Sequence, residues 1–144
     1  MGILVNIVAA EEEEIEAIGA SLHPLEDWSG IERRGLDVAK FATLHCLLTG
    51  DEFELAAILH EPVLVSAEGA WVLRIDAAAM TRLATLDEEA LTHVAEELAA
   101  AEVFEYEGWP EEEVLALVLD LADLAQLAES QGQALFVWMH PLLT

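Results

Sequence analysis

Basic residues are scarce in this sequence. Its 144 residues include 5 Lys and Arg against 29 Asp and Glu, which gives a formal net charge of -24. Residues 83–144 contain no Lys or Arg at all. Nucleic-acid binding relies on Lys and Arg contacts to phosphates, so DNA and RNA are excluded as expected partners. An anionic membrane is disfavoured for the same reason. The macromolecular partner that this charge attracts is a basic protein.

Cysteines and long apolar runs are equally few. Cys46 is the only cysteine, so no intramolecular disulfide can form. The most apolar stretch, residues 114–128, is interrupted by Asp120 and Asp123 and is shorter than the roughly 20 residues that a membrane helix needs. The first residues lack the positive charge of a signal peptide. We therefore expect a soluble cytoplasmic protein.

The sequence also lacks the common catalytic motifs. It has no Gly-rich phosphate loop, no Gly-x-Ser-x-Gly elbow, no Cys-x-x-Cys pair and no His-Glu-x-x-His helix. These absences remove the readily recognised enzyme classes, and they favour a binding protein over an enzyme. We expect no cofactor and no metal.

Apolar residues are abundant, at 55% of the chain, which is too many for a disordered acidic tail. Their spacing predicts strands at residues 3–8, 62–66, 70–75 and 134–139. Helices are predicted at residues 10–22, 38–48, 77–83, 88–101 and 110–131, with a short helical turn over 51–59. The segments 24–35 and 102–109 are expected to be irregular.

These elements predict a single α+β domain spanning residues 1–144. We expect a small, mostly antiparallel sheet of four short strands packed against four to five helices, with the 110–131 helix central. An all-α core with one hairpin is the alternative. Local signals support several boundaries: Asp37 and Asp87 are expected N-caps, Gly50 is an expected C-cap, and residues 67–69 are an expected hairpin turn.

A few polar residues are candidates for a site. His93 and Glu97 are spaced i, i+4, which suits two metal ligands on one helix face, although a solvated face is the simpler interpretation. His45 and Cys46 are adjacent, and side chains at adjacent helical positions do not face each other. We interpret them as core residues. A possible ligand pocket would be formed by Asp37, Lys40 and His45.

A second candidate region combines acidic and aromatic residues after residue 101. Aromatic rings supply contact area and carboxylates attract basic partners, so this pattern is typical of an interface hot spot. The alternative is a linker whose rings pack inward. The predicted partner-binding residues are Glu102, Phe104, Glu105, Tyr106, Glu107, Trp109, Glu111, Glu112 and Glu113.

Residues 35–51, which read GLDVAKFATLHCLLTGD, resemble a segment typical of the YfbM-like family, a domain of unknown function. The initial Met-Gly, the acidic helix after the first strand and Trp138 in the last strand extend this similarity along the chain. Phe41 departs from it, because the family usually has Trp there, and the 104–109 linker is shorter. The resemblance implies a compact α+β domain and no catalytic residues.

The function that the sequence favours is an inhibitor or immunity-type protein that occludes a basic toxin or enzyme. One alternative is a small-ligand-binding protein or an enzyme with a pocket near residues 36–50. A structural or oligomerising role is another, although a charge of -24 opposes self-association. Adaptation to high salt is a further explanation for the acidic surface.

Overall fold

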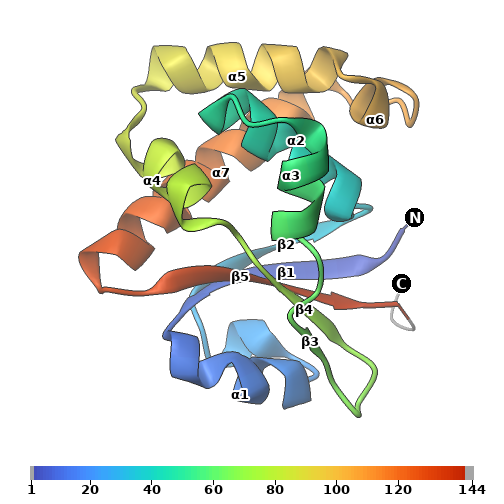
Figure 1. Ribbon diagram of the computed structural model, residues 1–144, viewed down its shortest axis with the longest axis vertical. Coiled ribbons are helices and arrows are strands. Elements are labelled where there is room, and N and C mark those ends of the chain that lie inside the picture. Colours follow the sequence, from blue (N-terminus) through green and yellow to red (C-terminus); the bar gives the residue numbers. More distant parts are fainter. Residues whose placement is uncertain (1, 142–144) are drawn as a thin grey trace.

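The computed structural model describes residues 2–141, and its centre is one antiparallel sheet of five strands (Figure 1). The strands are β1 (Leu4–Ala10), β2 (Gly30–Arg34), β3 (Leu64–Val65), β4 (Trp71–Arg74) and β5 (Ala134–His140). They lie in the order β2-β1-β5-β4-β3, and every neighbouring pair is antiparallel. The α+β prediction is confirmed, and the all-α alternative is wrong.

The two central strands are apolar along nearly their whole length because both faces of the sheet are covered. β5 is buried at all seven positions, and β1 is buried from Val5 onward. Their side chains alternate between two hydrophobic clusters, one on each face. Asn6 is the polar exception in β1 and contacts Glu32 of β2.

The larger cluster lies under a thick helical layer. Its helices are α2 (Val38–Thr49), α3 (Phe53–Leu59), α4 (Ala77–Thr85), α5 (Glu88–Ala100), α6 (Glu102–Glu105) and α7 (Glu111–Ser130). The central helix is α7, which packs on β1 and β5 with one side and on α4 and α5 with the other. Two-sided packing explains why its apolar stripe is so wide.

The opposite face is covered by α1 (Ile15–Ala20), which lies beneath the sheet in Figure 1. This helix begins later than the sequence suggested, because β1 continues to Ala10 and a 3-10 turn (Glu12–Glu14) follows. Glu11 and Glu14 form a reciprocal capping box at that turn. Hydrogen bonds from the Glu11 backbone and from Trp28 lower the pKa of Glu14.

β2 is the strand that the sequence analysis missed. Its residues, GIERR, carry little apolar pattern because β2 is an edge strand and is only partly covered. Gly30 is required there: a Cβ at this position would collide with the carbonyl oxygen of Ile7. A short second 3-10 turn (Pro24–Glu26) precedes the strand.

The remaining expectations hold with small changes. The β3–β4 hairpin turns at Gly69, whose φ is 99°, but its first strand has only two residues. The expected linker at 102–109 contains the one-turn helix α6. Within residues 2–141, no helix is long and apolar enough to cross a membrane.

Candidate functional site

The three predicted pocket residues lie on or beside α2, but they do not form one pocket. Asp37 caps the start of the helix and accepts a hydrogen bond from the Lys40 amide at 2.9 Å. Lys40 lies in the first turn, whereas His45 lies five residues further on, about 7.5 Å along the axis. The two side chains have separate sets of partners, so α2 carries two polar clusters instead of one site.

The first cluster surrounds the buried ammonium group of Lys40, whose side chain is only 1% exposed. Its Nζ donates to Glu107 at 2.9 Å and to Asp37 at 3.3 Å, and it lies 5.8 Å from the centre of the Phe104 ring. The hydrogen bond from Lys40 lowers the pKa of Glu107. This cluster ties the segment after α6 to the start of α2.

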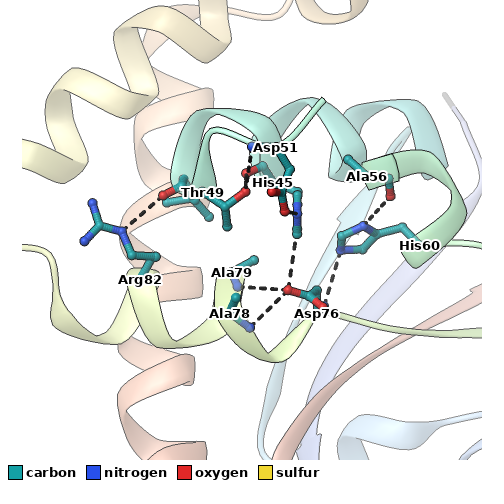
Figure 2. Close-up of polar contacts among 10 residues, drawn as sticks. His45, Thr49, Asp51, Ala56, His60, Asp76, Ala78, Ala79 and Arg82 are labelled. Atoms are coloured by element: carbon teal, nitrogen blue, oxygen red, sulfur yellow. Dashed lines mark hydrogen bonds and ion pairs between the residues drawn. The ribbon is translucent and has the colours of Figure 1, made fainter. Parts of the chain in front are cut away.

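The second cluster surrounds His45, which is also 1% exposed (Figure 2). Its Nε2 lies 2.7 Å from Asp51 Oδ2, and its Nδ1 lies 3.8 Å from Asp76 Oδ2, too far for a hydrogen bond. Nδ1 therefore has no hydrogen-bond partner within the described residues. The bond with His45 lowers the pKa of Asp51.

His60 completes this cluster and packs edge-on against His45, with ring centres 5.2 Å apart. Its Nδ1 donates to the Ala56 carbonyl at 2.9 Å, which leaves Nε2 to accept from the Asp76 amide at 3.4 Å. This arrangement requires a neutral ring. Burial lowers the pKa of His60, in agreement with that requirement.

The histidine cluster holds α3 at both of its ends. Asp51, bound by His45, stands just before the helix, and His60 is the residue that ends it. Asp76 links His60 to α4, because its amide bonds to His60 and its carboxylate caps that helix through the amides of Ala78 and Ala79. The cluster therefore fixes α3 relative to α2 and α4.

The space around these residues does not favour metabolite chemistry. The cavity that His45 and His60 share has a volume of about 10 Å³, enough for roughly one water molecule. A wider depression of about 540 Å³ lies between the end of α2 and the start of α4, beside Thr49 and Arg82. Arg82 is already committed there, because its Nε donates to the Leu48 carbonyl at 3.1 Å.

Metal and thiol chemistry receive no support in the part of the chain that the structure describes. No group of three or more metal-binding side chains occurs between residues 2 and 141. His93 and Glu97 form an exposed pair at 3.0 Å, as expected of a solvated helix face. Burial and the charge of Asp51 raise the pKa of Cys46, which disfavours the reactive thiolate.

The predicted partner-binding region divides into buried rings and exposed charges. Phe104 is buried in the core, so its ring is not available to a partner, and Trp109, which is partly buried, packs edge-on against it. Glu107 is committed to Lys40. Tyr106, which is 90% exposed, remains on the surface with the glutamates. The exposed glutamates are Glu102, Glu105, Glu111, Glu112 and Glu113.

Sequence reasoning missed an exposed apolar surface, which we call the α3–β4 patch. It consists of Phe53, Leu55, Ile58, Leu59, Val63, Val65 and Trp71. These are seven of the ten large hydrophobic residues that are exposed in the described chain. Its signal in the sequence was an apolar helical and strand pattern, which does not distinguish a buried face from an exposed one.

Four of the five basic residues have a carboxylate or carbonyl partner within the described chain. Arg33 pairs with Asp120, Lys40 with Glu107 and Arg74 with Glu12. Arg82 is held by the Leu48 carbonyl. The outward-facing charge is consequently almost entirely negative.

Comparison with known proteins finds a structurally similar protein, but one with no assigned activity. No family model matches this chain, and no curated protein matches it. Among solved structures, the chain is similar to YfbM from Escherichia coli, a protein of unknown function. The TM-score is 0.47 and the sequence identity is 18%, over 94% of this chain and 99% of that chain. YfbM is also the protein for which the family resembled by residues 35–51 is named.

Proposed function

We propose that this protein binds a basic protein and occludes it, as an inhibitor or immunity-type protein does. The observation that supports the proposal is the lack of unpaired positive charge. Four of the five Lys and Arg residues are engaged by a carboxylate or a carbonyl, so little positive charge is left to repel a basic partner from a chain with net charge -24. A surface of one sign speeds association with an oppositely charged partner, up to about 10⁸–10⁹ M⁻¹s⁻¹.

A small-ligand or enzymatic function is less well supported. The side chains of Lys40 and His45 are buried and engaged by carboxylates. The cavity beside His45 is too small for a metabolite. Within residues 2–141, no hydroxyl or thiol group lies within hydrogen-bond distance of the His45 ring.

Affinity capture from native lysate at low ionic strength, followed by elution with a salt gradient, tests the proposal. The expected result is one basic protein at equal stoichiometry, whose association rate falls steeply as salt rises. The matched control is a variant with Glu111, Glu112 and Glu113 changed to Gln, which lowers the charge without touching the core. Many weakly bound basic proteins, all lost at modest salt, would indicate generic attraction and would contradict the proposal.

A further inference from the structure

The α3–β4 patch extends over two consecutive parts of the fold, the exposed side of α3 and the β3–β4 hairpin that follows it. Leu55, Ile58 and Leu59 share a face of α3, as their i, i+3 and i+4 spacing requires. The chain passes from α3 directly into β3, where Val65 lies opposite Trp71 of β4. Trp71 in turn is paired with Met139, a residue of the cluster under the helical layer. Val65 and Trp71 therefore lie on the same side of the sheet as α3.

The exposure of this patch is large for apolar side chains. Ile58 is 64% exposed and Val65 is 66% exposed, whereas the interior of the fold is closely packed. Apolar residues scattered singly on a surface need no explanation, but seven of the ten large exposed hydrophobic residues of the described chain lie within residues 53–71. Such an area marks a contact surface.

The patch is also held in place before anything binds. The pair between His45 and Asp51 fixes the start of α3, and the bond between His60 and the Asp76 amide fixes its end. A surface that is already ordered loses little conformational entropy on binding. The strand β3 has only two residues, so a partner contacts side chains here and does not add a long strand to the sheet.

Charge decides between the possible occupants. Residues 51–73 contain five carboxylates and no Lys or Arg. The carboxylates are Asp51, Glu52, Glu54, Glu61 and Glu68. A second copy of the chain, docked symmetrically, would bring these same charges together. An apolar surface with an acidic rim instead complements a partner whose apolar side chains are flanked by Lys or Arg.

We infer that the α3–β4 patch is the docking surface for the basic partner, and that the partner presents an apolar centre with a basic rim. The inference rests on the proposed function and adds which surface of the protein contacts the basic partner. It replaces the sequence-based prediction of a hot spot around Phe104 and Trp109, whose rings are packed against each other.

The test uses two probes of equal positive charge: a synthetic amphipathic helix of leucine and lysine, and polylysine. The patch variant is Ile58→Gln combined with Val65→Thr. The matched control is Leu22→Gln combined with Leu25→Gln, which alters two exposed leucines outside the patch. Affinity is measured by titration at physiological salt, the footprint by amide chemical shifts, and the oligomeric state by sedimentation.

We expect the patch variant to bind the amphipathic helix about tenfold more weakly, as loss of a central apolar contact does. The control variant should bind the amphipathic helix within about twofold of the unchanged protein. The amide chemical shifts that change on binding should belong to residues 53–71. Polylysine should bind all three proteins with similar affinity. Equal binding of the amphipathic helix by all three proteins would refute the docking surface and leave the proposed function standing.

Failure of both probes to bind the unchanged protein would refute the proposed function and the inference together. A dimer of the unchanged protein that the patch variant dissociates would identify a second copy as the occupant. That result would overturn the inference of a basic partner.

Discussion

The ion pairs of Lys40 allow a prediction about stability. Counting salt bridges suggests that replacing Lys40, which loses two pairs, costs more than replacing Glu107, which loses one; the burial of Lys40 predicts the opposite order. Lys40 is buried, whereas Asp37 and Glu107 are 51% and 48% exposed. Replacing Lys40 with Met removes both ion pairs, yet the carboxylates remain in contact with water. Replacing Glu107 with Gln removes only one pair, but it leaves a buried ammonium group with reduced compensation.

The magnitudes follow from this asymmetry. Lys40→Met also removes the cost of burying a charge, and the Met sulfur can keep favourable contact with the Phe104 ring, so we expect a net loss within about 1 kcal/mol. A hydrogen bond to a charged group contributes about 1.5–3 kcal/mol. Because Glu107 is half exposed, water partly replaces it, and Glu107→Gln should cost about 1.5–2 kcal/mol.

Urea unfolding measures both effects without adding ions. With a slope of about 2 kcal/mol/M, Glu107→Gln should lower the midpoint by roughly 1 M, and Lys40→Met by less than half of that. The double variant should match Lys40→Met closely, since the ion pair between Lys40 and Glu107 is then already absent and the glutamine side chain introduced by Glu107→Gln still accepts the hydrogen bond from the Trp109 indole. Glu105→Gln, an exposed neighbour without an ion pair in the described chain, is the control. A larger loss for Lys40→Met than for Glu107→Gln would refute the reasoning.

Three further predictions concern stability. Burial lowers the pKa of His60 below 6.5, so the unfolded chain binds more protons at pH values between the folded pKa and 6.5. The free energy of unfolding should therefore decrease as the pH is lowered through that window, and His60→Gln should flatten this dependence. Gly30→Ala should cost about 1–3 kcal/mol in a denaturant titration, because its new methyl group meets the Ile7 carbonyl; an unchanged midpoint would contradict the close approach. Asp87→Ala removes the cap bonded to the Ala90 amide at 2.8 Å, and calorimetry should show a loss of about 1 kcal/mol, whereas Asp87→Asn should retain most of the stability.

Local sequence patterns correctly predicted those features of the fold that depend only on neighbouring residues. Asp37 and Asp87 cap their helices, Gly50 ends α2 with a φ of 82°, and the hairpin turns where Gly69 predicted it. Each of these features depends on residues within four positions of one another. The paired central strands were also predictable, because strands covered on both faces leave a continuous apolar run.

The site depended on contacts that no local pattern specifies. Lys40 and Glu107 are 67 residues apart, and Asp76 reaches His45 from another helix. The strand β2 was missed because an edge strand needs little apolar character, and its pairing with β1 depends on Gly30. The sequence placed aromatic residues after residue 101 but could not show which way their rings face.

The arrangement of acidic residues bears on whether the charge is a binding device or a general adaptation to salt. Some carboxylates have structural roles, since Asp37, Asp76 and Asp87 each accept helix N-terminal amides. Glu54 and Glu61 have no such role: their side chains form no hydrogen bond or ion pair within residues 2–141. A general adaptation to salt gives no reason for seven large apolar side chains to remain exposed beside such carboxylates. A docking surface for a basic protein does, because the partner neutralises the rim and covers the apolar centre in one event.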